Sequence, residues 1–212
     1  MKKVILFVTL MVASFATKSQ EVNPKTVLDK MSTVYKAMEG YEISFVQKVI
    51  SDAEVIDRLN GKASVSKEKF VVKFQEQLIY CNGPILWTYI VESQELTISN
   101  FDPEEGQIDP SNIYDIYKDG FTYEYKRQDT LNGEAVHVIE LISTDEDSDF
   151  TNIIMYVNQQ NSYLKGWDLI DYAGAKTAFE VTGFTPNKSF SETFFEFNYD
   201  ANPVQHEEDL RY

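Results

Sequence analysis

The side chains that could carry out catalysis are few in this 212-residue chain, and they are scattered along it. His137 lies between two valines in a run typical of a strand, and His206 lies in an acidic stretch. Zinc sites and acid–base pairs need partners at defined spacing, which neither histidine has. Cys81, the single cysteine, has no basic neighbour to stabilise a thiolate. We therefore interpret all three as structural or surface residues.

One acidic group has the spacing that opens a calcium-binding loop: Asp145, Asp147 and Asp149. Such a loop requires glycine at its sixth position and glutamate at its twelfth. The chain has Phe150 and Tyr156 there, so an acidic hairpin loop is the better interpretation.

A second acidic group could supply the paired carboxylates of a glycosidase, and its members are Asp102, Glu104, Glu105 and Asp109. They fall in a loop with proline and glycine that interrupts the strand pattern, so ordinary loop acidity is the commoner explanation. A hydrolase that uses these carboxylates is kept as a third hypothesis. The sequence has no glycine-rich phosphate loop, serine nucleophile elbow or Cys/His cluster, so we predict no catalysis, metal or cofactor.

Composition and charge narrow the class of protein further. The chain is 43% hydrophobic and 14% aromatic, which excludes collagen-like, low-complexity and disulfide-scaffold proteins. The formal net charge is −15. Because an acidic surface repels phosphate backbones and favours solubility, we predict a monomer that does not bind nucleic acid.

The first residues have the pattern of a secretory signal peptide. Lys2 and Lys3 precede a mostly apolar run over 4–15, and Ser14-Phe15-Ala16 offers a small–x–small cleavage site. We predict a signal peptide over 1–20, cut between residues 16 and 20, and a single domain over 21–212. No later stretch is apolar for long enough to cross a bilayer.

Helical signals are confined to a few places. Asn23-Pro24 begins a helix that Gly40 closes, and its apolar stripe is Val27, Leu28, Met31, Val34, Tyr35 and Met38. Asp109-Pro110 begins a shorter helix that ends at Gly120, with one face formed by Ile113, Ile116 and Tyr117. A third helical turn is expected over 189–192.

Most other segments alternate between apolar and polar residues, as strands do. The expected strands cover 41–49, 70–74, 85–91, 121–125, 135–143, 150–158, 164–172, 178–185 and 193–198. Asn82-Gly83 and Asn132-Gly133 predict two-residue hairpin turns. About ten antiparallel strands in one meander must curl as their twist accumulates. We predict a mainly β fold with a few α-helices, in which the sheet forms a barrel or half-barrel with a concave face to fill.

Three motifs resemble the LolA family of periplasmic lipoprotein carriers. YEISFVQKV at 41–49 follows the first helix and resembles the family's A/S-x-F-x-Q strand. NGPILWTY at 82–89 resembles its D/N-G-x-x-L-W-x-Y hairpin. ETFFEF at 192–197, followed by Pro203-Val204, resembles its closing strand. The acidic, aromatic-rich sequence is similar to Bacteroidota-type members.

The resemblance implies an unclosed β-barrel with a helical lid, whose hydrophobic cavity holds the acyl chains of a lipoprotein in the periplasm. Acylated lipoproteins are then the cargo, supplied by an inner-membrane ABC exporter of the LolCDE type. Delivery implies an outer-membrane acceptor of the LolB type. The same architecture also suits a binding protein for another lipid or apolar precursor, which is the alternative hypothesis.

Strand alternation together with the resemblance predicts a cavity lined by Phe45, Phe70, Val72, Phe74, Trp87, Tyr89 and Trp167. The lid is predicted to present Leu28, Met31, Val34, Tyr35, Met38, Ile113, Ile116 and Tyr117. The family's Lys-Arg-Pro segment, whose Arg holds the lid, is replaced here by Lys-Glu-Lys-Phe at 67–70, with Glu68 nearest its place. We therefore expect the lid to be held in a different way.

Overall fold

The structure is a computed structural model that describes residues 22–102, 109–145 and 148–211. The predicted signal peptide lies outside these residues, as do Glu104, Glu105 and Asp147 of the two acidic groups. Among the described residues, no helix is long and apolar enough to cross a membrane.

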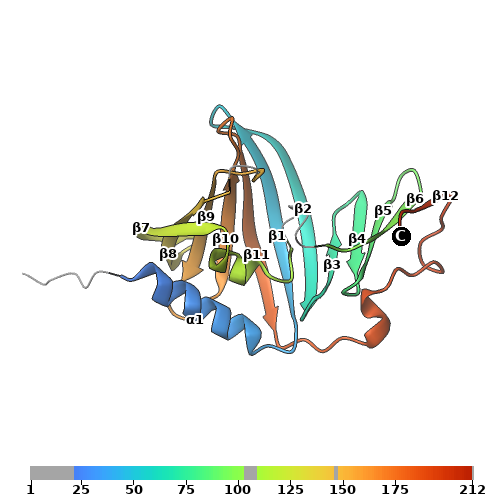
Figure 1. The fold of residues 1–212 in the computed structure, drawn as a ribbon, viewed down its shortest axis with the longest axis horizontal. Helices are drawn as coiled ribbons and strands as arrows, with labels where there is room; N and C mark the ends of the chain where they lie inside the picture. Colours follow the sequence, from blue (N-terminus) through green and yellow to red (C-terminus); the bar gives the residue numbers. More distant parts are fainter. Residues whose placement is uncertain (1–21, 103–108, 146–147, 212) are drawn as a thin grey trace, which may run out of the picture.

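One curled sheet of twelve strands dominates the described part of the chain (Figure 1). Its order is β12-β6-β5-β4-β3-β2-β1-β11-β10-β9-β8-β7, and all neighbours are antiparallel except β12, which runs parallel to β6. The strands are β1 (Tyr41–Ser51), β2 (Glu54–Ser66), β3 (Lys69–Lys73), β4 (Gln77–Cys81), β5 (Ile85–Ile90), β6 (Glu95–Asn100), β7 (Phe121–Leu131), β8 (Glu134–Ser143), β9 (Asn152–Asn158), β10 (Leu164–Ile170), β11 (Lys176–Pro186) and β12 (His206–Asp209).

The barrel is unclosed, because β12 and β7 form the two edges and do not pair with each other. The expectation of one continuous meander is wrong in one respect. Strands β1 to β6 extend from the centre to one side, and β11 to β7 extend to the other, joined by the β1–β11 pair. The chain between β6 and β7 must therefore cross from one side of the sheet to the other, and this crossing carries a helical segment onto the concave face (Figure 1).

The N-terminal helix α1 (Pro24–Lys36) begins as predicted. The Asn23 side chain accepts a hydrogen bond from the Thr26 backbone N–H, and Pro24 occupies the first turn, where no N–H is needed. The second predicted helix is a 3-10 helix, η1 (Ile113–Lys118), and it begins after Asn112, not at Asp109. The Asp109 carboxylate instead accepts hydrogen bonds from the backbone N–H and the hydroxyl of Ser111. Such tight helices are short.

The C-terminal expectations are partly wrong. A 3-10 helix, η2 (Glu192–Phe195), starts later than the predicted turn, and it replaces the strand expected over 193–198. Phe195 and Phe197 lie two residues apart in the sequence and are both buried, so their spacing resembles the alternation of a strand.

Strands β2, β4, β6 and β12 were not predicted. The first half of β2 is solvent-exposed on both faces and therefore does not alternate.

Two hydrophobic clusters lie on opposite faces of the sheet. The larger fills the concave face beneath α1 and η1, and Leu28 and Met31 of the helix are fully buried in it. The smaller lies on the other face of β3 to β6, where Val71 and Tyr80 contact the C-terminal aromatics Phe195 and Phe197. The concave cluster contains the cavity described next.

Candidate functional site

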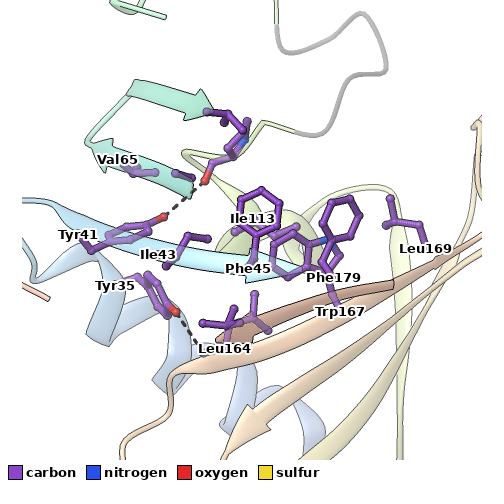
Figure 2. A pocket seen from close by; sticks show the side chains of 14 residues that line it. Tyr35, Tyr41, Ile43, Phe45, Val65, Ile113, Leu164, Trp167, Leu169 and Phe179 are labelled. Carbon is purple, nitrogen blue, oxygen red and sulfur yellow. Dashed lines mark hydrogen bonds between the residues drawn. The ribbon is translucent and has the colours of Figure 1, made fainter. Parts of the chain in front are cut away.

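A cavity of about 230 Å³ lies on the concave face of the sheet (Figure 2). Its walls come from α1, η1 and the strands β1, β2, β3, β10 and β11. None of the lining side chains is charged; they are Tyr35, Tyr41, Ile43, Phe45, Ala63, Val65, Val72, Pro110, Ile113, Leu164, Trp167, Leu169, Phe179 and Val181. Such a lining suits an apolar ligand.

Strand periodicity explains how one wall is built. Tyr41, Ile43 and Phe45 are two residues apart on β1 and therefore point to the same face. Phe45 pairs across the sheet with Gly61, and the Phe45 ring lies directly over that glycine. A Cβ at residue 61 would overlap the ring. Glycine at this position therefore leaves the space that the Phe45 side chain occupies.

Aromatic rings form one end of the cavity. Trp167 stacks on Phe179 with ring centroids 4.8 Å apart and planes at 12°, and Phe45 lies 6.1 Å from the Phe179 ring. The Trp167 side chain is deeply buried, and its indole Nε1 has no hydrogen-bond partner among the described residues. Figure 2 shows Trp167, Phe179 and Leu169 together at this end.

Two tyrosines form the opposite end. The Tyr35 hydroxyl accepts a hydrogen bond from the Leu164 backbone N–H at 3.1 Å, and the Tyr41 hydroxyl donates to the Pro110 carbonyl at 3.4 Å (Figure 2). Burial raises the pKa of both phenols, so both stay neutral at ordinary pH. The hydroxyls of this end are thus already paired, and the surface that they present to the cavity is apolar.

Polar contacts on the outside hold α1 against η1. The Tyr117 hydroxyl donates to Asp29 at 2.7 Å, and the Lys118 ammonium donates to the Ser32 hydroxyl at 3.1 Å. These two contacts, together with the ion pairs of Asp115, attach α1 to η1. Whether α1 acts as a lid stays a prediction.

Asp115 is the centre of this attachment. Its carboxylate is only 9% exposed and forms ion pairs with Lys36 of α1 and with Lys118, the latter at 2.7 Å. Burial raises the pKa of Asp115, but hydrogen bonds from Lys118, Lys36 and Ser32 outweigh that effect and hold the pKa below its usual range. The carboxylate is therefore ionised at neutral pH, and it links the two helical segments.

The structure places three of the predicted cavity residues, Phe45, Val72 and Trp167, on the cavity wall. Phe70 and Phe74 belong to the same cluster without lining the cavity. Phe70 packs edge-on against Phe101, and Phe74 packs edge-on against Phe45 at 5.7 Å. Phe74 thus supports a lining side chain.

Trp87 and Tyr89 lie away from this cavity, in the cluster on the opposite face. The register explains the difference, because directly paired residues share a face. Phe70 pairs with Cys81, which in turn pairs with Leu86, so the residues next to Leu86 on β5 point the other way. The Tyr89 hydroxyl also donates a hydrogen bond to the Pro203 carbonyl, which links the C-terminal segment to β5.

The predicted lid residues divide into three groups. Tyr35 and Ile113 line the cavity itself. Leu28, Met31 and Tyr117 are buried in the concave cluster, and Met38 and Ile116 pack against it. Val34 is half-buried.

Several lining residues were not proposed from the sequence. Tyr41 and Ile43 share the alternation of Phe45, so the same signal could have found them. Ala63 and Val65 lie in a strand that was not predicted, and nothing local identifies them. Phe179 lies in a predicted strand, but only its pairing with Trp167 brings it to the cavity.

The candidate catalytic groups are not assembled into a site in the described part of the chain. His137 lies 3.3 Å from the Tyr125 hydroxyl, and burial lowers the pKa of its imidazole. Burial raises the pKa of the Cys81 thiol to about 11, so it is not a thiolate at neutral pH. No three His, Cys, Asp or Glu side chains among the described residues are grouped to hold a metal.

Comparison with known proteins identifies the family. The family model described as outer membrane lipoprotein carrier protein LolA matches residues 36–198, which is most of the chain. The chain belongs to the LolA family. The matched region extends from α1 to just beyond η2 and so contains every strand that lines the cavity. LolA-family proteins are non-enzymatic periplasmic carriers of lipoproteins.

Individual relatives and solved structures are similar to this chain over most of its length. An outer-membrane lipoprotein carrier protein of Legionella pneumophila (strain Lens) is 23% identical over 185 residues, which cover 85% of this chain and 89% of the relative. An uncharacterized conserved protein of Thermus thermophilus shares the fold with a TM-score of 0.60 and 12% identity, over 89% of this chain and 98% of that one. A LolA superfamily protein of Nitrosomonas europaea is similar at a TM-score of 0.46 and 12% identity, covering 84% and 99%.

Proposed function

We propose that this protein is a periplasmic carrier that binds the acyl chains of lipoproteins and moves them from the inner to the outer membrane. In this proposal residues 1–20 are a signal peptide, and 21–212 form the carrier domain, which acts without catalysis. Membership of the LolA family supports the general role.

The single observation that carries the proposal is the uncharged cavity under α1 and η1. Its lining is formed by aliphatic and aromatic side chains, and the tyrosine hydroxyls at one end are already hydrogen-bonded. Each methylene moved from water to such a site gains about 0.8 kcal/mol. An acyl chain is therefore favoured there, whereas a charged or strongly polar ligand would lose its hydration without compensation.

The size of the cavity bears on how cargo is held. Pockets for small molecules usually measure about 300–1,000 Å³, and this one measures about 230 Å³. Three acyl chains of a lipoprotein do not fit in that volume. We infer that a triacylated cargo enters only when α1 and η1 separate from the sheet, which requires the hydrogen bond between the Leu164 N–H of β10 and the Tyr35 hydroxyl of α1 to break.

A carrier of single-chain lipids or another apolar precursor is the second candidate, and the same volume favours it. One acyl chain needs far less rearrangement than three. In the first case the partners are an inner-membrane ABC exporter of the LolCDE type and an outer-membrane acceptor of the LolB type. In the second case neither partner is required.

Native mass spectrometry of the protein purified from its own periplasm separates these functions. A bound triacylated lipoprotein is the expected result. A free lipid in its place would favour the second candidate. Protein without bound lipid that hydrolyses glycosides would revive the hydrolase that uses loop carboxylates.

A cavity-filling variant provides a matched test in vitro. Ala63 lies on the cavity wall, so Ala63→Phe should fill part of the cavity and reduce the binding of a lipopeptide at least tenfold. Ala135 is exposed on β8, and Ala135→Phe adds the same ring outside the cavity. Equal loss of binding in both variants, or no loss in Ala63→Phe, would contradict the cavity as the binding site.

A further inference from the structure

One side chain that lines the cavity carries a buried polar atom with no hydrogen-bond partner in the part of the chain that the structure describes. Trp167 is 8% exposed, and its Nε1–H finds no acceptor among the described residues. In the described part of the chain the one comparable atom is Asp115 Oδ1, and that atom is paired with the Lys118 ammonium at 2.7 Å. An unpaired buried donor is costly, and a specific one in a folded protein calls for an explanation.

Water in the cavity is a poor partner for this indole. A buried water molecule is held by two to four polar groups. The other polar side-chain atoms of the lining are the hydroxyls of Tyr35 and Tyr41, which are bonded to Leu164 and Pro110 at the opposite end of the cavity (Figure 2). Near Trp167 the lining consists of Phe179, Leu169 and Phe45, which offer no side-chain acceptor.

We propose that the cavity is a site for an acyl ester or acyl amide, whose carbonyl oxygen accepts a hydrogen bond from Trp167 Nε1. The proposal rests on the proposed acyl-binding function and specifies its ligand. A plain hydrocarbon leaves the indole N–H unpaired, whereas a carbonyl satisfies it and still presents an apolar chain to the rest of the wall. The Trp167 side chain is thus a specificity-determining residue.

The arrangement also gives the ligand a direction. Trp167, Phe179 and Leu169 lie at one end of the cavity, and Tyr35 and Tyr41 lie at the other (Figure 2). A carbonyl at Trp167 lets the acyl chain extend toward the two tyrosines, where the hydroxyls are already paired.

A pair of matched ligands tests the carbonyl directly. Palmitoyl lysophosphatidylcholine carries an ester, and hexadecyl lysophosphatidylcholine carries an ether in its place, with no carbonyl. Binding of each below its micelle concentration is measured by calorimetry to the full-length mature protein. We expect the ester to bind about tenfold more tightly, which corresponds to one hydrogen bond to a buried donor.

Two variants assign the preference to the indole. Trp167→Phe keeps an aromatic ring against Phe179 but removes the N–H, so it should bind ester and ether equally. Trp87→Phe changes the other tryptophan, which lies in the cluster on the opposite face, and should keep the preference. Thermal melts of both variants check that they are folded. In Trp87→Phe the remaining emission comes from Trp167 and should differ between the ester and the ether complexes.

The possible outcomes are distinct. Equal binding of ester and ether by the unchanged protein would overturn the carbonyl proposal and leave acyl binding intact. A preference that persists in Trp167→Phe would also overturn it, because the indole would not be the donor. Binding of neither ligand to any variant would instead count against the proposed function itself.

Discussion

The hydroxyl of Tyr35 on α1 accepts a hydrogen bond from the backbone N–H of Leu164 at the start of β10, and both residues line the cavity. This contact joins the helix to a strand on the far half of the sheet. It also satisfies an N–H at the strand end, where the ladder is irregular between Leu164 and Gly166. The helix is thus tied to the wall of the cavity that it covers.

Removal of that hydroxyl should destabilise the protein. In Tyr35→Phe the ring still packs, but the Leu164 N–H remains buried without its acceptor, and we expect a loss of about 1–3 kcal/mol in the free energy of unfolding. Urea denaturation measures it. Tyr114→Phe is the matched control, because Tyr114 stacks on Tyr35 at 5.2 Å and its hydroxyl bonds to no described residue. A similar loss in both variants would mean that ring packing, not the hydrogen bond, is responsible.

Replacement of Gly61 with alanine should destabilise the folded protein. The added methyl group would overlap the Phe45 ring, which must then move into the cavity, at a cost of about 1–3 kcal/mol. At Gly183 on β11 the same change meets Ser44 Cβ at an ordinary 3.5 Å, so Gly183→Ala should be neutral or slightly stabilising. Thermal melts compare the two variants. If Gly61→Ala is as stable as Gly183→Ala, the Phe45 ring is not confined as described.

The attachment of α1 to η1 should weaken in acid. The pKa of Asp115 is lower in the folded protein than its usual value of about 3.9. Its ion pairs therefore stabilise the fold fully above that usual value, and this contribution is lost as the pH falls through the lower folded pKa. Asp115→Asn should remove this part of the pH dependence and lower stability by about 1–2 kcal/mol, because the lysine partners still reach water.

Urea midpoints measured from pH 7 down to pH 2 test this expectation. Asp209 is the control, because its pairing with Arg211 holds its pKa at about 2 but leaves it exposed. Asp209→Asn should hardly change stability at neutral pH, as is usual for surface pairs. An Asp115→Asn variant with the same acid profile as the unchanged protein would contradict the role of Asp115.

Binding of a lipid ligand should protect the backbone amides of helix α1 from hydrogen exchange. If it acts as a lid, its amides should exchange with deuterium well before those of β1 and β11 in the lipid-free protein, and should become protected on addition of lipid. Hydrogen exchange with mass spectrometry measures both states. The full burial of Leu28 and Met31 allows the opposite result, a core helix protected equally in both states, which would exclude the lid role.

The sequence alone determined part of the local structure of this protein and its curled β architecture. The Asn23-Pro24 start of α1 and the Asn132-Gly133 turn between β7 and β8 follow from backbone preferences that neighbouring residues hardly change. At that turn both residues have positive φ, which such hairpin turns require. The curled β architecture followed from the number of alternating strands, because accumulated twist acts on any long sheet.

The tertiary structure alone decided which face of each strand meets the cavity. Trp87 and Val72 alternate equally well in sequence, but the register across β3, β4 and β5 sends them to opposite faces. Register depends on pairings between segments, and a shift of one residue exchanges the two faces. The two hydrophobic faces of β3 to β5 arise because the C-terminal aromatics cover the second one, a contact more than a hundred residues distant in sequence. The attachment of α1 through Asp115, and the unpaired indole of Trp167, likewise depend on which groups the fold brings together, and burial determines how much each contributes.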